Sequence, residues 1–383
     1  MKTLDQLAAE ASRIVGLRPD PRWRRSSEDL TRSDGLSRKQ WFRGNRADVR
    51  VKLVRESLLE GRPWRSLVRI HLPKYGTSET RPIDIPTILD QARLYALQDW
   101  LRGYAEPLLC ARAVAFRPQK STVKLIRAVK GIISLKGYHW AAVVDVQDYF
   151  GSLTWPRLDA LIESLPADRA VQDLLKALVR VRVVDQVTGA PVPRQGRGIP
   201  QGLSVSPTLA NLFLAEWDRH VNHALSYLGA MLIRYCDDLL ILARTREGAE
   251  QSVTIVHDRL RHKGLTAKPG HGAVVDLSAA AVRWLKLDFS VQGIEAPAEV
   301  LQWKIAGYHD KFDRDLFTID GLEQSIRGLE TYYEQILPAP RAREVSGIIR
   351  EGTGDLFAYL SSPDPSIPRT HRKESPRRHA RPR

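Results

Sequence analysis

Two adjacent acids stand in the middle of an otherwise apolar stretch of this 383-residue chain. Residues 233–242 read Ile-Arg-Tyr-Cys-Asp-Asp-Leu-Leu-Ile-Leu, so strands are expected on both sides of Asp237 and Asp238. Carboxylates in such a setting are costly to bury unless a cation neutralises them. The pattern therefore predicts a β-hairpin that carries both acids at its tip, where they could bind a metal ion.

A third carboxylate, Asp145, ends a second apolar strand that begins at Ala141. Alone it could be a strand end or a helix N-cap, and the Asp-Asp pair alone could be a turn, although simple turns more often carry Asn-Gly or Asp-Gly. A pair of Mg²⁺ ions about 4 Å apart needs shared carboxylates from converging strand ends. Taken together, the three acids predict a two-metal centre that activates a hydroxyl and stabilises a leaving pyrophosphate.

Residues 145–150, Asp-Val-Gln-Asp-Tyr-Phe, resemble the first catalytic motif of the reverse transcriptases, and residues 235–238 resemble their metal-binding hairpin. The resemblance runs from about Lys74 to Phe289 with the motifs in the family's order. It is closest to bacterial enzymes that look like group II intron proteins. It implies catalysis by Asp145, Asp237 and Asp238, and metal ligation by these three residues and Val146.

The aromatic side chain of Phe150 falls where this family keeps a bulky ring under the sugar of the incoming nucleotide. A ring there clashes with a ribose 2′-hydroxyl, so the resemblance implies that the substrate is a dNTP. An ordinary core aromatic is the alternative, and the spacing from Asp145 favours the sugar gate. The resemblance also implies that Asp148 and Tyr149 contact the nucleotide.

Residues 198–211, Gly-Ile-Pro-Gln-Gly-Leu-Ser-Val-Ser-Pro-Thr-Leu-Ala-Asn, are similar to the family's Gln-Gly-x-x-x-Ser-Pro motif. Glycine at 202 permits close backbone approach and proline at 207 suits the opening of a helix. The resemblance implies that Gln201 binds the nucleotide and that Gly202, Ser206 and Pro207 lie near template or primer. Reverse transcriptases of diversity-generating elements usually depart from this pattern, so that subgroup is disfavoured.

Two cations, Lys74 and Arg81, lie seven residues apart across an expected finger hairpin. In the family this pair contacts the triphosphate, a role that suits positive side chains, although either could be a solvated surface charge. Residues 115–118, Ala-Phe-Arg-Pro, resemble the family's Gly-Phe-Arg-Pro segment near the template. Arg117 is therefore a predicted template contact, and Tyr235 of the hairpin is a second.

The chain departs from the family after the acidic hairpin. Where the family has Gly-Leu-x-Leu-Asn-x-x-Lys-Thr, residues 264–272 read Gly-Leu-Thr-Ala-Lys-Pro-Gly-His-Gly. The family lysine is either displaced to Lys268, the predicted template or primer contact, or replaced by His271. The next block of the family has Leu-Gly, whereas this chain has Trp-Leu-Lys at 284–286. The sequence therefore does not predict which residues would contact the primer there.

Charge is the informative bulk property, because 59 Lys and Arg against 44 Asp and Glu give +15 and a pI near 9.9. Such an excess suits a polyanionic partner; a soluble surface with a basic tail is the alternative. Two cysteines without metal or redox spacing favour a reducing compartment. The polar N-terminus and the lack of any run of eighteen apolar residues predict a cytoplasmic protein without a membrane partner.

The elements that must position these residues follow from periodicity. Helical pattern covers residues 1–16, 90–108, 155–180, 207–226, 247–263 and the region from 299, while strand pattern covers 67–72, 81–86, 139–145, 230–235, 239–244 and 282–294. The resemblance implies an α+β right-hand polymerase fold, with fingers and an antiparallel palm followed by an α-helical thumb.

The expected domains follow the same order along the chain: a basic N-terminal extension (1–66), fingers (67–140), a palm with finger insertions around 155–197 (141–298), a thumb (299–361) and a disordered basic tail (362–383). The extension carries Trp23, Trp41, Phe42 and Trp64 among arginines. Such a mixture fits either nucleic-acid contact or a buried core with arginines outside.

The expected function is an RNA-directed DNA polymerase that uses two Mg²⁺ ions, with Mn²⁺ as a substitute, to add dNTPs to a primer on an RNA template. The chain resembles standalone bacterial enzymes of antiphage defence, which implies a partner non-coding RNA as template and a cDNA product. Alternatives are a retron or group II intron-like enzyme, an RNA-directed RNA polymerase, against which Phe150 argues, and a non-catalytic RNA-binding maturase. Primer and oligomeric state stay open.

Overall fold

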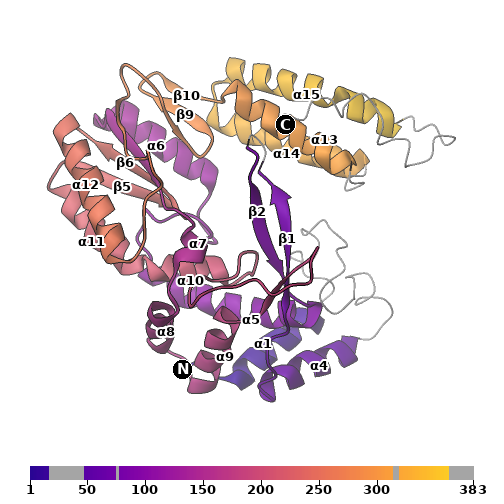
Figure 1. The fold of residues 1–383 in the computed structure, drawn as a ribbon. Helices are drawn as coiled ribbons and strands as arrows, with labels where there is room; N and C mark the ends of the chain where they lie inside the picture. Colours follow the sequence, from indigo (N-terminus) through magenta and orange to yellow (C-terminus); the bar gives the residue numbers. More distant parts are fainter. Residues whose placement is uncertain (17–46, 75–76, 314–318, 362–383) are drawn as a thin grey trace. The chain divides into compact units, whose positions relative to one another are not determined.

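The computed structural model describes residues 1–16, 47–74, 77–313 and 319–361 (Figure 1). The predictions for Trp23, Trp41, Phe42 and the tail from 362 lie outside these ranges. The chain forms two compact units. The first comprises Met1–Leu72, Pro82–Lys120 and Trp140–Val274, and the second comprises Pro73–Arg81, Ser121–His139 and Val275–Arg383.

The first unit is built on an antiparallel sheet whose strands run in the order β5-β6-β3. These strands are β3 (Trp140–Asp145), β5 (Ala230–Tyr235) and β6 (Asp238–Ala243). A short strand, β7 (Val274–Asp276), which begins at the last residue of this unit, adjoins β3. Nearly every side chain of β6 is buried, because helices cover the sheet and its strands can be apolar on both faces.

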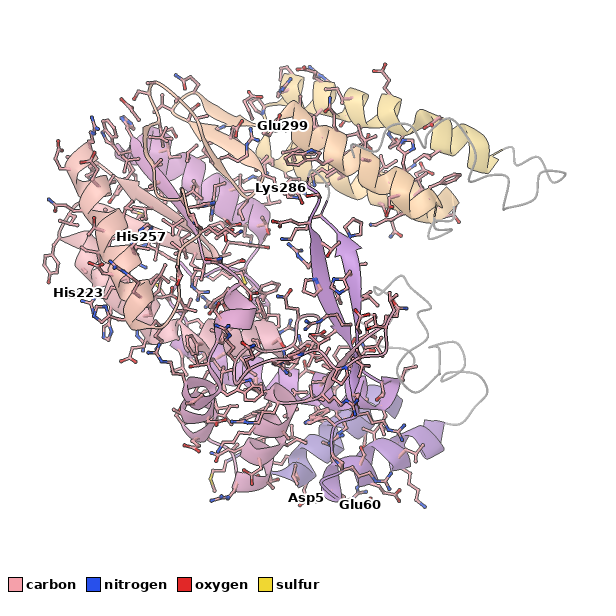
Figure 2. All side chains as sticks on the ribbon, in the orientation of Figure 1. Asp5, Glu60, His223, His257, Lys286 and Glu299 are labelled. Atoms are coloured by element: carbon pink, nitrogen blue, oxygen red, sulfur yellow. The ribbon has the colours of Figure 1, made fainter. Side chains whose placement is uncertain are left out.

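Two helices, α11 (Ala215–Ser226) and α12 (Arg246–His262), pack on this sheet (Figure 1). His223 of α11 and His257 of α12 mark this helical layer in Figure 2. Thr245 caps α12 by accepting a hydrogen bond from the N–H of Gly248 at 3.1 Å, a favourable start for a helix. The other helices of the unit within the described residues are α1 (Leu4–Gly16), α4 (Ala47–Leu59), α5 (Ile88–Ala105), the 3₁₀ helix η1 (Glu106–Leu108), α7 (Tyr149–Ser152), α8 (Trp155–Glu163), α9 (Arg169–Val179) and α10 (Ser206–Phe213).

A second sheet has the order β2-β1-β4, with β1 (Leu67–Pro73), β2 (Thr80–Ile85) and β4 (Val183–Asp185). Strands β1 and β4 are parallel, with Leu67 opposite Val183. A turn at Gly189 follows β4, and Val184 bridges to Pro191 beyond it. Gly189 has φ +67°, which a turn of this kind requires.

Where the structure describes it, the second unit contains a three-stranded sheet and four helices. Its elements are α6 (Thr122–Lys136), β8 (Val282–Trp284), β9 (Leu287–Ser290), β10 (Gly293–Glu295), α13 (Ala298–Asp313), α14 (Ile319–Ile336) and α15 (Ala339–Ser361). Helix α15 packs on α13 and α14, and α14 also packs on α6. The guanidinium of Arg127 on α6 donates to the carbonyl of Gln335 at 2.6 Å.

The turn between β8 and β9 explains one departure from the expected pattern. Leu285 and Lys286 have φ +50° and +63°, the left-handed conformation of a two-residue hairpin turn. Glycine or asparagine adopts this conformation at lower cost than leucine or lysine. The chain therefore makes the tight turn that Leu-Gly would make, and it carries a lysine there.

The predicted α+β class is confirmed. The predicted helices and strands are present with shifted boundaries, but the helices expected over 155–180 and 207–226 are each divided into two, and the strand region expected over 282–294 forms three strands. The sequence reading proposed neither α4, α6 nor β7. The domain boundaries stay a prediction. Within the described ranges, no helix combines the length and the hydropathy that crossing a membrane requires.

Candidate active site

The acidic hairpin joins β5 to β6 through a turn of two residues, Cys236 and Asp237. Tyr235 and Asp238 are paired across the hairpin, so Asp238 begins β6 beside the tip formed by its two predecessors. Cys236 is buried and has φ +61°. The backbone therefore directs two consecutive carboxylates to the same end of the sheet at the cost of one strained residue.

Strand β3 delivers the third carboxylate to this end. Asp145, its last residue, is paired with Asp238 of β6. The N–H of Val146 donates to the carbonyl of Asp237 at 3.1 Å, which ties the strand end to the hairpin tip. The structure thus brings Asp145 together with Asp237 and Asp238, although Asp145 lies far from the other two in the sequence.

The electrostatics of this cluster are unfavourable for three bare carboxylates. Burial, and after it the charge of Asp145, raises the pKa of Asp237 and raises that of Asp238 to about 7. Hard oxygen ligands that repel one another are the donor set that divalent cations such as Mg²⁺ prefer. The residues present therefore fit a divalent metal ion.

Lys268 supplies the cation that lies beside the acids. Its Nζ is 2.8 Å from Oδ1 of Asp145, and its N–H donates to the carbonyl of Asp145 at 2.8 Å. Burial disfavours the ammonium, but the pairing with Asp145 outweighs this and raises the pKa of Lys268. Among the described contacts, Lys268 is therefore the member of the Lys268–His271 pair that meets the acids.

A metal ion would compete with this ammonium for Asp145. Across the described ranges, no three His, Cys, Asp or Glu side chains are gathered as a ready-made metal-ligand set. In the acidic cluster the Lys268 ammonium already neutralises part of the charge. Loading a metal there therefore requires small side-chain movements.

A buried guanidinium, that of Arg234, stabilises the hairpin. Arg234 is 1% exposed and donates to both carboxylate oxygens of Asp218, at 2.8 and 2.6 Å. It also donates to Oδ1 of Asn211 at 3.0 Å and to the carbonyl of Cys236 at 3.1 Å. Burial works against its charge, but Asp218 reverses this and raises the pKa of Arg234. The hairpin tip is thus held through its own backbone.

Arg234 and Asp218 are absent from the residues that the sequence reading selected. A signal was present, because an arginine inside an apolar strand is costly to bury without an acid partner. The partner could not be chosen from the sequence, since many acids were available.

The loop over residues 198–202 depends on a glycine. Gly202 has φ +101°, and an added Cβ would lie 2.9 Å from Cγ2 of Ile83 and 3.1 Å from the carbonyl oxygen of Asp84. The N–H of Gln201 donates to Oδ2 of Asp84 at 3.1 Å. The loop backbone therefore lies directly on β2, and no larger residue fits at position 202.

Ser206 and Pro207 shape the exit of this loop. The buried Ser206 hydroxyl donates to the carbonyl of Pro200 at 2.7 Å, and Pro207 lies in the first turn of α10. Both residues therefore fix the path from loop to helix. Their contact with template or primer stays a prediction.

The segment Asp148–Phe150 turns sharply after β3. Asp148 has φ +41°, and its carboxylate folds over Gly151, where a Cβ would lie 2.1 Å from Oδ2. Tyr149 is buried, and its hydroxyl donates to the carbonyl of Ala210 at 2.6 Å. Phe150 is half-buried, with its ring centroid 5.8 Å from that of Tyr149. Tyr149 thus anchors the turn while Phe150 keeps an accessible face; the nucleotide contacts predicted here stay predictions.

Arg117 lies inside its loop. Its side chain is 6% exposed and pairs with Glu106 at 2.6 Å, and it donates to the carbonyls of Cys110 and Ala113 at 2.7 and 2.8 Å. A template contact by Arg117 would require these bonds to break. Phe116, just before it, is 47% exposed with φ +60° and was not among the predicted contacts.

Lys74 and Arg81 belong to the second unit. Nζ of Lys74 lies 2.8 Å from the carboxylate of Glu79, and its N–H donates to the carbonyl of Glu79 at 3.0 Å. Arg81 is exposed on β2. Tyr235 in the first unit is half-buried beside the acidic tip.

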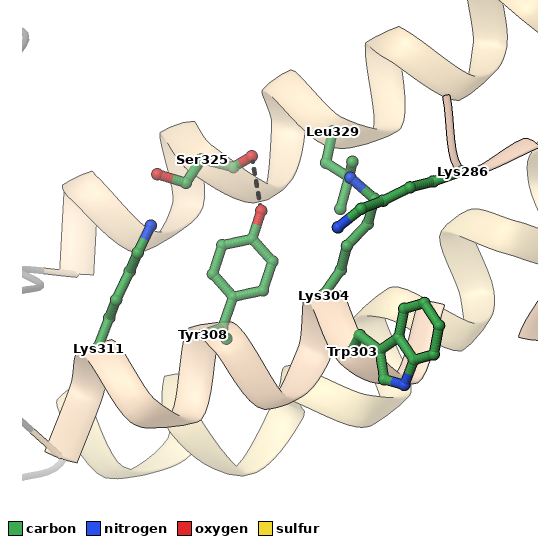
Figure 3. A pocket seen from close by; sticks show the side chains of 8 residues that line it. Lys286, Trp303, Lys304, Tyr308, Lys311, Ser325 and Leu329 are labelled. Carbon is green, nitrogen blue, oxygen red and sulfur yellow. Dashed lines mark hydrogen bonds between the residues drawn. The ribbon is translucent and has the colours of Figure 1, made fainter. Parts of the chain in front are cut away.

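A pocket of about 250 Å³ lies among the helices of the second unit (Figure 3). The Tyr308 hydroxyl of α13 donates to the carbonyl of Ser325 on α14 at 3.1 Å. Burial lowers the pKa of Lys304, and the neighbouring charge of Lys286 lowers it further. The pocket is lined by Lys286, Trp303, Lys304, Gly307, Tyr308, Lys311, Ser325 and Leu329. A surface with three lysines and two aromatic rings suits phosphate and sugar groups.

Comparison with known proteins identifies relatives of the central part of the chain. The sequence profile of the family described as "Reverse transcriptase (RNA-dependent DNA polymerase)" matches residues 72–271. The group II intron-encoded protein LtrA of Lactococcus lactis subsp. cremoris is 26% identical over 176 residues, which are 46% of this chain and 28% of LtrA. The retron Ec86 reverse transcriptase of Escherichia coli is 25% identical over 182 residues, 47% of this chain and 51% of that protein.

Protein YkfC of Escherichia coli K12 is 26% identical over 184 residues, 46% of each chain. The chain thus spans about a quarter to a half of the curated relatives it matches. Among solved structures, apo telomerase from Candida tropicalis has a TM-score of 0.46 at 12% identity, over 81% of this chain and 61% of that chain.

Proposed function

Because this chain belongs to the reverse transcriptase family, whose profile matches residues 72–271, we propose that it is an RNA-directed DNA polymerase that extends a primer with dNTPs. The α+β fold is that of a right-hand polymerase. One observation carries the proposal: Asp145, Asp237 and Asp238 meet at one end of a buried sheet, with no acid-neutralising partner other than Lys268 among the described contacts of the three. Divalent metal ions are general to the family.

Two Mg²⁺ ions, with Mn²⁺ as a substitute, would be held by Asp145, Asp237 and the backbone oxygen of Val146, with Asp238 contributing less directly. When bound, such ions activate the primer 3′-hydroxyl and stabilise the leaving pyrophosphate. The protein's own part is to hold the three carboxylates in place before the ions arrive. The ladder between β3 and β6 and the bond from Val146 to Asp237 do this.

The nucleotide would lie between Phe150 and the loop at residues 198–202. Gln201 is proposed to hydrogen-bond it, and Lys74 and Arg81 to contact its triphosphate. The N–H of Ile199 donates to the carbonyl of Phe150 at 2.9 Å, so the gate and the loop are directly joined. This bond supports a single nucleotide site made by both motifs.

Template and primer are proposed to be bound in part by the pocket whose lysines come from α13 and from the turn between β8 and β9. The charge of +15 supports a polyanionic partner. The proposed template is a partner non-coding RNA copied in antiphage defence. Retron and group II intron-like activities are the alternatives, since LtrA and the retron Ec86 enzyme are both relatives.

Replacing Phe150 by Val is expected to raise incorporation of rNTPs relative to dNTPs by about tenfold or more, because a smaller side chain leaves room for the 2′-hydroxyl. The measurement is single-nucleotide primer extension with each substrate. Phe213, a buried aromatic of α10, provides the control: Phe213→Leu should leave the ratio unchanged. Unaltered discrimination in Phe150→Val would show that Phe150 is a core residue instead of the gate.

The test of the whole proposal gives the purified protein a primed RNA template with Mg²⁺ and either dNTPs or rNTPs. Extension with dNTPs supports it. Extension with rNTPs alone would favour an RNA-directed RNA polymerase, and RNA binding without extension would favour a maturase. Sequencing the nucleic acid that copurifies with the protein tests the template assignment.

A further inference from the structure

A buried carboxylate lies behind the nucleotide loop, outside the motifs that carry the chemistry. Asp84 near the end of β2 is 1% exposed. Arg69 on β1 donates to it twice, from Nε to Oδ1 at 2.7 Å and from a terminal nitrogen to Oδ2 at 3.0 Å. Charge-assisted, bidentate bonds of this kind are the strong ones. Asp84 is therefore rigidly held by the strand next to it.

Asp84 grips the loop through both its side chain and its backbone. Its Oδ2 accepts the N–H of Gln201 at 3.1 Å, and its own N–H donates to the carbonyl of Gln201 at 2.6 Å. The two bonds occupy the backbone N–H and the backbone carbonyl of Gln201. They leave the Gln201 side chain, which is half-buried, as the part of the residue that can act elsewhere.

Gly202 allows this close approach. A Cβ at Gly202 would meet Ile83 and the Asp84 carbonyl at 2.9 and 3.1 Å, so the loop already lies in contact with β2. At its other end the loop is hydrogen-bonded to the segment that contains Phe150. Gly198 donates to the carbonyl of Leu153 at 2.7 Å, and Ile199 donates to that of Phe150 at 2.9 Å. The loop is thus fixed at both ends, by Phe150 and by Asp84.

The geometry points to Asp84 as a positioning residue that sets the affinity for the incoming dNTP without touching it. It does so by fixing the backbone of Gln201, so that the Gln201 side chain and the Phe150 ring face one nucleotide. This inference rests on the proposed function, because it assigns a role within the same nucleotide site. Arg69 shares the role as the partner that orients the Asp84 carboxylate.

Asp84→Asn is the direct test, because the amide has the same shape but loses the charge and one acceptor. The KM for dNTP should rise about tenfold, while kcat and the KM for the primed template stay within about twofold. Arg69→Gln should reproduce this KM change in direction. Asp84→Glu, which keeps the charge, should restore part of the affinity.

The chain offers a matched control in Asp90. This carboxylate is 2% exposed, pairs with Arg93 at 2.9 Å and accepts the N–H of Arg65 at 3.2 Å. Asp90→Asn therefore removes a buried acid of the same kind whose bonds lead away from the nucleotide loop. It should lower thermal stability as Asp84→Asn does and leave the KM for dNTP unchanged. Equal dNTP KM values in wild type, Asp84→Asn and Asp90→Asn would overturn the inference.

Hydrogen exchange separates this inference from the proposed function. In Asp84→Asn the amide of Gln201 should exchange at least about tenfold faster than in wild type, and in Asp90→Asn it should not. Unchanged exchange in a wild type that polymerises dNTPs would overturn the inference alone, whereas failure of the wild type to polymerise would overturn the proposed function and the role in dNTP binding that rests on it. If Asp84→Asn does not fold, Arg69→Lys, which breaks the bidentate pair but keeps the charge, carries the same two measurements.

Discussion

Replacing Asp237 by Asn is expected to lower the rate of DNA synthesis by about a thousandfold or more and, at the same time, to stabilise the metal-free protein. The first effect follows from the loss of a carboxylate that the two ions would share. The second follows because burial and the charge of Asp145 already raise the pKa of Asp237, so a neutral amide relieves repulsion. The free energy of unfolding is expected to rise by about 1 kcal/mol or more, which is the order of the repulsion within one such charge pair.

Primer extension and thermal unfolding in EDTA measure the two effects on the same protein samples. Titration with Mg²⁺ should then raise the Tm of the wild type more than that of the variant, because a ligand of the folded state stabilises it by mass action. Asp258→Asn, at an exposed acid on α12, is the control and should change neither quantity. Retained synthesis, or a lower Tm in EDTA, would contradict the assignment of Asp237 as a metal ligand.

Arg234→Met is expected to cost about 3–5 kcal/mol of unfolding free energy, because it leaves Asp218 buried without its counter-charge. Adding Asp218→Leu should recover much of this loss, since buried ion pairs can often be replaced by apolar residues at little cost. The double variant should fold but extend primers slowly, because Arg234 no longer holds the carbonyl of Cys236. Urea unfolding of the two single variants and the double variant gives the coupling energy of the pair.

An exposed arginine provides the reference for the measurements on Arg234 and Asp218. Arg283 pairs with Asp288 and with Glu299, each at 2.6 Å, and its side chain is 42% exposed. Arg283→Met should cost no more than about 1 kcal/mol, as surface ion pairs usually do. A loss at Arg234 no larger than at Arg283 would mean that the buried network does not stabilise the hairpin.

The strands that present the acids could be predicted because they are local. An apolar run on each side of Asp237 and Asp238 specifies a hairpin, and Asp145 closes another such run. We expected the three acids to lie together because two metal ions need shared carboxylates, and this expectation did not require the register of the strands. The register itself, Asp145 opposite Asp238, is a property of the folded sheet.

The parts that could not be predicted depend on contacts between distant segments. Nothing near Arg234 in the sequence designates Asp218 as its partner, and nothing near Asp84 points to Arg69 or Gln201. The parallel pairing of β1 with β4 also joins segments that are distant in the sequence, so it could not be predicted either. The choice between Lys268 and His271 was undecided for a related reason, since only the path of the chain after α12 brings Lys268 to Asp145.

The buried thiol at the hairpin tip determines how the protein should respond to oxidants and alkylating reagents. Burial raises the pKa of Cys236, and the nearby charge of Asp237 raises it further, so at neutral pH the side chain is a thiol and a poor nucleophile. Cys110, the other cysteine, is more accessible. Sulfenic acid and thioether adducts should therefore form first at Cys110, leaving the residue between Tyr235 and Asp237 chemically intact under oxidative stress.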